Sequence, residues 1–144
     1  MRSDIVHNVG VEQCISPITK TVGLTADVTK GTAIDLAGCE AAMFQVSLGT
    51  IVHANTTGAV VLEESATTTD GDFTTIDAAD IVTGDTFTGL VVATSGKNLK
   101  AGYIGTKRYI RAKFTQTTGA GSGALPIAVN VIKGSNRDNP VASV

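Results

Sequence analysis

The run GYIGTKRYIRAKFT, residues 102–115, gathers the side chains of this 144-residue chain that are best suited to binding a ligand. It holds four of the eleven Lys and Arg residues and both tyrosines. Basic side chains interleaved with an aromatic ring can bind a nucleic-acid backbone, with the ring stacking on a base. The net charge of −2 and the pI of about 5.6 argue against that function, because nucleic-acid-binding domains usually have a pI above about 9. We therefore expect no nucleic-acid partner, and the run also lacks the glycine and lysine spacing of a phosphate-binding loop.

The same run has the alternation of a β-strand, in which successive side chains point to opposite faces. The inward set is then Ile110, Ala112 and Phe114, and the outward basic row is Lys107, Tyr109, Arg111 and Lys113. We predict that this basic row is a solvated or interface-forming strand face. Residues 31–96 contain no Lys or Arg and are rich in Asp and Glu, so an acidic partner for the row exists within the chain or on a neighbouring subunit.

Other reactive side chains do not form a catalytic group. Nucleophilic catalysis needs a base beside Ser, Thr or Cys, and the only histidines, His7 and His53, lie in no recognisable motif. Glu63 and Glu64 are adjacent, so in a strand they point to opposite faces and cannot act together on one bond. We expect no enzyme activity, no catalytic residues and no cofactor.

Metal binding is not predicted either. Asp70, Asp72 and Asp77 suggest a calcium loop, but their spacing fails the EF-hand pattern, and a hairpin turn at Asp70 is favoured. Cys14 and Cys39 lack a CxxC spacing and are too few for a zinc site. Buried or free thiols are expected, and a disulfide, within a chain or locking an assembly between chains, is the alternative.

The segments that position these side chains are predicted to be β-strands. Thr, Val and Ile are abundant, and β-branched side chains favour strands. Sustained helical periodicity is absent. We predict strands over residues 41–52, 59–65, 88–96 and 125–134, one in the basic run, and one or two short strands in residues 21–40.

These strands predict an all-β fold, a single-domain antiparallel β-sandwich that is jelly-roll-like. Residues 1–20 are expected to form an extended N-terminal arm, residues 21–144 the sandwich, and residues 117–124 an exposed loop. No apolar run reaches the length of about 20 residues that spans a bilayer, so no membrane partner is expected. The N-terminus has no apolar region of a secretory signal, so export is not implied.

Three segments carry a family likeness: GYIGTKRYIRAKFT, VVLEESATTTDGDFTTID and VIKGSNRDNPVA. The chain resembles a group of small structural proteins of tailed bacteriophages that share a GYxGxKRYxR signature and a terminal KGxxRxxP. The residues that match the first signature are Gly102, Tyr103, Gly105, Lys107, Arg108, Tyr109 and Arg111. Those that match the second are Lys133, Gly134, Arg137 and Pro140. The likeness spans about residues 33–142 and leaves out Cys14.

The resemblance implies a non-enzymatic virion component. It points to a capsid decoration or cement protein that binds the major capsid protein on the capsid surface as a homo-oligomer, with a trimer favoured. Such a protein is made in the cytoplasm of the bacterial host. A head–tail connector, a tail component and a host-surface glycan-binding jelly roll are the alternatives. The order DGDFTTI before RYIR also resembles discoidin-like jelly rolls, which supports the sandwich architecture alone.

Overall fold

A computed structural model describes residues 8–22, 27–82, 84–85, 87–88, 90–118 and 123–136. The strands in these residues are β1 (Val9–Val22), β2 (Asp27–Lys30), β3 (Ile34–Asp35), β4 (Cys39–Leu48), β5 (Thr56–Ser65), β6 (Thr74–Thr75), β7 (Ile81–Val82), β8 (Asn98–Tyr103), β9 (Tyr109–Thr118) and β10 (Gly123–Asn136). Short 3-10 turns lie at η1 (Asp70–Asp72), η2 (Ala78–Asp80) and η3 (Val92–Thr94). None of the helical segments described here has the length and apolar character that crossing a bilayer requires.

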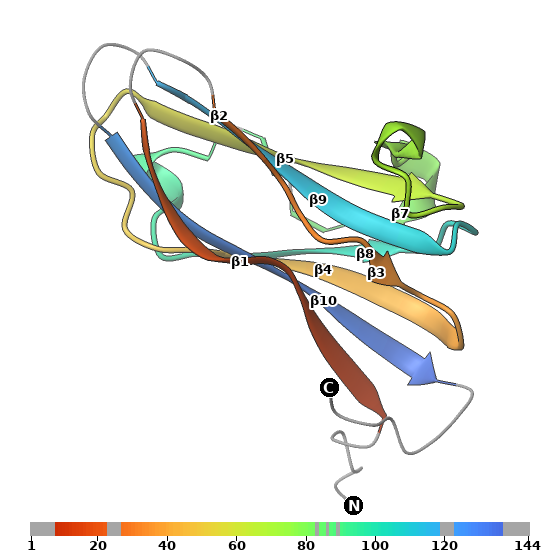
Figure 1. Ribbon diagram of the computed structural model, residues 1–144. Helices are drawn as coiled ribbons and strands as arrows, with labels where there is room; N and C mark the ends of the chain where they lie inside the picture. Colours follow the sequence, from red (N-terminus) through yellow and green to blue (C-terminus); the bar gives the residue numbers. More distant parts are fainter. Residues whose placement is uncertain are drawn as a thin grey trace, which may run out of the picture.

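The strands form two antiparallel sheets that pack face to face (Figure 1). Sheet A has the strand order β1-β10-β4-β8-β7, and sheet B has the order β2-β9-β5-β6, with β3 also paired to β9. The pairing is nested: β1 pairs with β10, β2 and β3 with β9, β4 with β8, and β5 with β6. A long antiparallel hairpin rolled over two sheets has this nesting, which makes the chain a jelly-roll sandwich, as predicted.

Alternating side chains fill the space between the sheets. In β9 the inward residues Ile110, Ala112 and Phe114 are fully buried, as predicted from the basic run. They face the inward set of sheet A, which includes Phe44 of β4 and Val129 of β10, and these are equally buried. Because a shift of one residue would turn each strand inside out, this alternation fixes the register of the central strands.

The prediction of a separate N-terminal arm is wrong for the described part of that segment, residues 8–20. Residues 9–22 form β1, which pairs with β10 from Val9 opposite Gly134 to Val22 opposite Gly123. Cys14 is buried against the core, and the Thr32 N–H donates to its carbonyl oxygen at 2.7 Å. The first strand is therefore part of the sandwich rather than an arm beside it.

The prediction of a strand over residues 88–96 is also wrong. Leu90 forms one bridge to Gly58, and the chain then turns through η3. The Thr94 hydroxyl accepts from the Val91 N–H at 3.0 Å and donates to the Val91 carbonyl at 2.7 Å. A Thr side chain that bonds the nearby backbone in this way replaces the ladder bonds of a strand.

The turn at Asp70 joins an antiparallel pair, but it is wider than a two-residue hairpin. Between β5 and β6 the chain passes through η1, where the Asp72 N–H donates to the Thr69 carbonyl at 3.0 Å. Of the loop predicted over residues 117–124, residues 117–118 end β9 and residues 123–124 begin β10, and residues 119–122 lie outside the described residues.

Candidate functional site

Arg111 occupies the outer face of sheet B, yet it is only 6% exposed. The register of β5 and β9 puts Glu63 directly opposite, and Arg111 Nε donates to Glu63 Oε2 at 2.8 Å. The η1 turn folds over the same position, so that Nη1 of Arg111 donates to Asp70 Oδ1. The ring of Phe73 covers the guanidinium, with its centroid 4.0 Å from Cζ. The arginine is thus enclosed by groups of its own chain.

Two lysines extend this arrangement into a chain of alternating charges. Lys113 Nζ lies 2.6 Å from Glu63 Oε1, and Lys30 Nζ lies 2.5 Å from Asp70 Oδ2. Burial opposes the ionisation of Glu63, but hydrogen bonds from Lys113 and Arg111 outweigh it and hold the pKa of this carboxyl below its ordinary value. Hydrogen bonds from Lys30 and then Arg111 lower the pKa of Asp70 in the same sense. We call Lys30, Asp70, Arg111, Glu63 and Lys113 the ionic cluster.

The loop between β8 and β9 is held by a buried tyrosine. Tyr103 is 4% exposed, and its hydroxyl donates to Glu64 Oε2 at 2.6 Å. The Lys107 N–H donates to the same hydroxyl oxygen at 3.1 Å, which ties the far side of the loop to the ring. Gly105 packs on the ring so closely that a Cβ there would lie 2.5 Å from it. Burial, together with the adjacent Glu64 carboxylate, raises the pKa of Tyr103.

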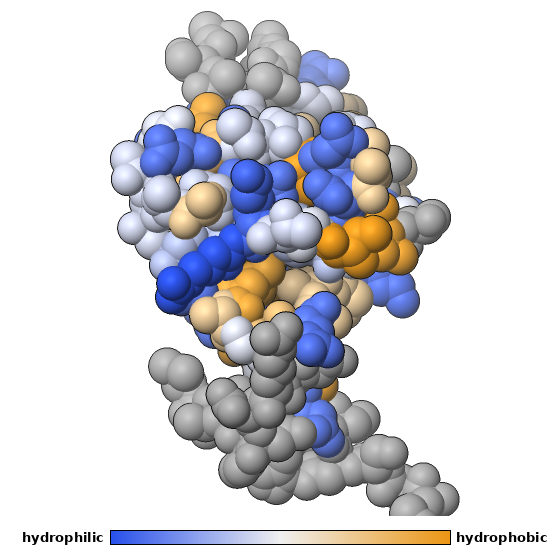
Figure 2. All heavy atoms as spheres, turned by 90° about the vertical axis from the view of Figure 1, so that its right-hand side faces the viewer, coloured by the Kyte–Doolittle hydropathy of each residue, from blue (hydrophilic) through white to orange (hydrophobic). Residues whose placement is uncertain are grey.

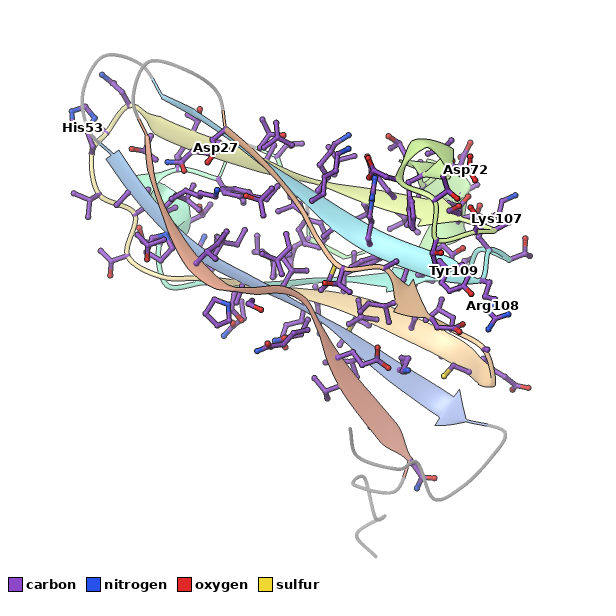
Figure 3. All side chains as sticks on the ribbon, in the orientation of Figure 1. Asp27, His53, Asp72, Lys107, Arg108 and Tyr109 are labelled. Atoms are coloured by element: carbon purple, nitrogen blue, oxygen red, sulfur yellow. The ribbon has the colours of Figure 1, made fainter. Side chains whose placement is uncertain are left out.

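The predicted basic row is not one exposed strip. Lys107 precedes β9 and is exposed, and none of the described side chains forms an ion pair with it. Tyr109 begins β9, and Arg108 stacks over its ring at 5.2 Å while binding Asp35 through two hydrogen bonds of 3.0 and 2.8 Å. Figure 3 shows Lys107, Arg108 and Tyr109 together at one end of the sandwich. Arg111 is buried, so an interface role for it is not compatible with its position.

A cleft of about 360 Å³ opens beside the β8–β9 loop. It is lined by Leu36, Cys39, Glu40, Tyr103, Thr106 and Arg108, among others. Ile104, also on its rim, is 61% exposed. Figure 2 faces this end of the molecule, where hydrophobic patches (orange) interrupt a largely hydrophilic surface (blue to white).

The remaining sequence candidates lie apart from this end. His53 is exposed at the opposite end of the sandwich in Figure 3, and His7 lies outside the described residues. Asp72 accepts a hydrogen bond from the Thr67 hydroxyl, and Asp77 accepts one from the Ala79 N–H at the start of η2. Within the described ranges, no His, Cys, Asp or Glu residues form a group that could hold a metal ion.

The cysteines do not form a disulfide in this structure. Cys14 Sγ accepts from the Ala112 N–H at 3.1 Å inside the sandwich, and burial raises the pKa of this thiol to about 11. Cys39 is half-buried at the start of β4, on the rim of the cleft. A bridge through Cys14, within the chain or to another subunit, would require the edge of the sandwich to open.

Asp35 and Ile104 were not singled out from the sequence, and Glu64 was considered only as a catalytic partner of Glu63. Glu64 had a signal, because it continues the inward alternation of Val60 and Leu62 and so places a carboxylate towards the core. Such a group needs a buried donor, which is Tyr103. Comparisons with protein-family models, with curated proteins and with solved structures give no significant match.

Proposed function

We propose that this jelly roll is a non-enzymatic head decoration protein of a tailed bacteriophage that binds the major capsid protein at the capsid surface. The observation that carries the proposal is the exposed Ile104 on a loop fixed from beneath by Tyr103. Ile104 lies beside the cleft lined by Leu36, Ala37 and Ala41, and an apolar surface of this kind on an ordered loop offers a protein-binding site. The sequence resemblance of the same loop to phage structural proteins supports the choice of partner.

The bracing of the loop favours tight binding. Association costs free energy when loops and side chains have to be ordered at the interface. Here the loop backbone already bonds to the Tyr103 hydroxyl through Lys107, and Gly105 rests on the ring. The Lys107 side chain is exposed and has no ionic partner among the described residues, so an acidic group of the capsid protein can pair with it.

Decoration stabilises a shell by mass action. A protein that binds assembled capsid subunits but not dissociated ones shifts the equilibrium towards the intact shell. A connector or tail component would use the same kind of contact at another place in the particle. A glycan-binding site in the cleft would need an exposed aromatic ring for a sugar to stack on, and Tyr103, the tyrosine that lines the cleft, offers none because its ring is buried.

The proposal is tested with heads assembled from the major capsid protein of the same phage but lacking this protein. Purified chain is mixed with the heads, and co-sedimentation measures binding. Ile104→Asp is expected to weaken binding by about tenfold or more, since charge is placed at the centre of the contact. Val52→Asp is the matched control, because Val52 is 56% exposed and adjoins His53 at the opposite end.

Two results would contradict the proposal. One is wild-type protein that does not co-sediment with the heads. The other is equal binding by the Ile104→Asp and wild-type proteins. Imaging of decorated particles then separates the alternatives, because a decoration protein covers the shell and a connector forms one ring at a single vertex.

A further inference from the structure

A row of apolar residues crosses the outer face of sheet A. The strand register places one residue from each strand in line: Val11 of β1, Ile132 of β10, Met43 of β4, Gly102 of β8 and Val82 of β7. Their neighbours in the central strands, such as Ala42 and Phe44 of β4 and Val131 of β10, are buried in the core, so this row faces outward. Val11 is 62% exposed and Val82 is 47% exposed, which leaves both ends of the row in solvent.

The rows on either side carry almost no charge. One neighbouring row consists of Gln13, Asn130, Gln45 and Lys100, and the other consists of Val9, Gly134 and Ala41. A fourth row, beyond the polar one, consists of Ala128, Ser47 and Asn98. The single charged side chain in these four rows is that of Lys100. The outer face of sheet B differs, because it carries the ionic cluster.

We propose that this face of sheet A binds the same face of a second copy of the chain, as a twofold dimer whose axis runs parallel to β4. Strand β4 then faces the partner's β4, β10 faces the partner's β8, and β1 faces the partner's β7. In the apolar row Met43 meets the partner's Met43, Ile132 meets the partner's Gly102, and Val11 meets the partner's Val82. Each row meets its own copy in reverse order.

Across the proposed axis, the apolar row of one copy lies opposite the apolar row of the other copy in reverse order, and the two rows are complementary in side-chain size. Gly102 has no side chain, and the Val82 side chain packs against it, with its Cβ 3.2 Å from the place that a Cβ at Gly102 would take. Under the twofold axis the branched Ile132 of the partner faces Gly102, the position without a side chain. Two packed sheets interdigitate best when large residues face small ones across a spacing of about 10 Å.

Size and charge favour a second copy over a different partner. Strands about 4.8 Å apart and rows about 6.8 Å apart give the fifteen positions of the four rows about 490 Å². Two copies would then bury about 1,000 Å² together, which is the lower end of the range for a specific interface. The neutral face offers no charge pattern to select an unlike partner. Across the axis Lys100 meets the partner's Asn130, and the two Lys100 residues are offset along the sheets by about two strand spacings, roughly 10 Å.

The test uses the expectation that Met43 faces itself. Met43→Asp and Met43→Lys are each expected to be monomeric, because like charges then oppose one another at the centre of the face. An equal mixture of the two variants is expected to form a heterodimer. Sedimentation velocity across a dilution series measures all three samples and the wild type. Val28→Asp is the matched control, since Val28 is 50% exposed on the outer face of sheet B and its variant is expected to dimerise.

Each outcome decides the proposal. Wild-type protein that is monomeric throughout the series, or trimeric, overturns it. So does a Met43→Asp variant that dimerises, or a mixture that fails to re-form a dimer although both variants melt at the wild-type temperature. The two proposals are tested separately, because dimerisation is tested at Met43 and capsid binding at Ile104. A failure of dimerisation would therefore leave the co-sedimentation result unchanged.

Discussion

Replacing Arg111 with Met is expected to destabilise the fold strongly, although the residue lies on the outer face of a sheet. The arginine is enclosed by Glu63, Asp70 and the ring of Phe73. Glu63 is itself buried, with a side chain that is 5% exposed. Methionine fills similar space but leaves this carboxylate with Lys113 alone.

The magnitude follows from which contacts are buried. Removing one partner of a buried ion pair costs about 3–5 kcal/mol, because the other charge remains buried and uncompensated. Lys113 still pairs with Glu63, which reduces this loss, and the contact with Asp70 adds little because that carboxylate is largely exposed. We therefore expect the free energy of unfolding to fall by about 3 kcal/mol, or the melting temperature by roughly 10 °C.

Urea unfolding at neutral pH measures the change, read from the midpoint at constant slope. Glu63→Gln is combined with Arg111→Met in a double-mutant cycle, and the double variant is expected to lose less than the sum of the single losses by about 1–3 kcal/mol. Lys107→Met is the control from the same basic run and is expected to stay within about 0.5 kcal/mol of wild type. An Arg111→Met loss below about 1 kcal/mol, or additive losses in the cycle, would refute the buried ionic cluster.

Four further outcomes are expected. The pKa of Glu63 lies below its ordinary 4.5, so the unfolded state takes up more protons in acid, and urea titrations should show stability falling as the pH drops below that value. Gly105→Ala places a Cβ 2.5 Å from the anchored Tyr103 ring and should cost about 1–3 kcal/mol in thermal unfolding, and an unchanged melting temperature would contradict the close packing of the loop on the ring. The fully buried Gln116 amide has no hydrogen-bond partner in the described structure, so Gln116→Met should raise stability by about 1–3 kcal/mol, and a lower urea midpoint would contradict this. Because burial raises the pKa of the Cys14 thiol to about 11, iodoacetamide should label it only after unfolding, and rapid labelling of native protein detected by mass spectrometry would be inconsistent with its position.

The central strands were predictable because each has one buried face. In β4 and β10 large apolar residues recur at every second position and are buried, and a strand with this pattern fits the sandwich in one register only. In β9 the same alternation correctly placed Ile110 and Phe114 inside. The jelly-roll architecture follows from several such strands separated by turns.

The first strand was not recognisable for a physical reason. The pairing of β1 with β10 is irregular between Gln13 and Ile15 and again between Ile15 and Ile18, so the period of two is broken twice. Its partner also lies at the other end of the chain, where Val9 meets Gly134. A local pattern carries no information on such a distant pairing, and the segment therefore resembled an arm.

The candidate site was predictable in its charges but not in its geometry. The acidic and basic segments indicated that carboxylates would meet the basic run, and Glu63 and Asp70 do so within the chain. The burial of Arg111 depends on the η1 turn, which brings Phe73 over the guanidinium. That covering arises from tertiary packing, and the strand pattern alone places Arg111 in solvent.

Several residues of the GYxGxKRYxR signature make contacts that hold the structure together. Tyr103 and Gly105 hold the loop, and Arg111 joins the ionic cluster, so the signature residues stabilise the fold itself. The open positions of the pattern include Ile104 and Thr106, which are both exposed at the cleft. If the proposed capsid role holds, selectivity for one capsid surface would come from such positions, because they can vary without disturbing the buried contacts that hold the loop.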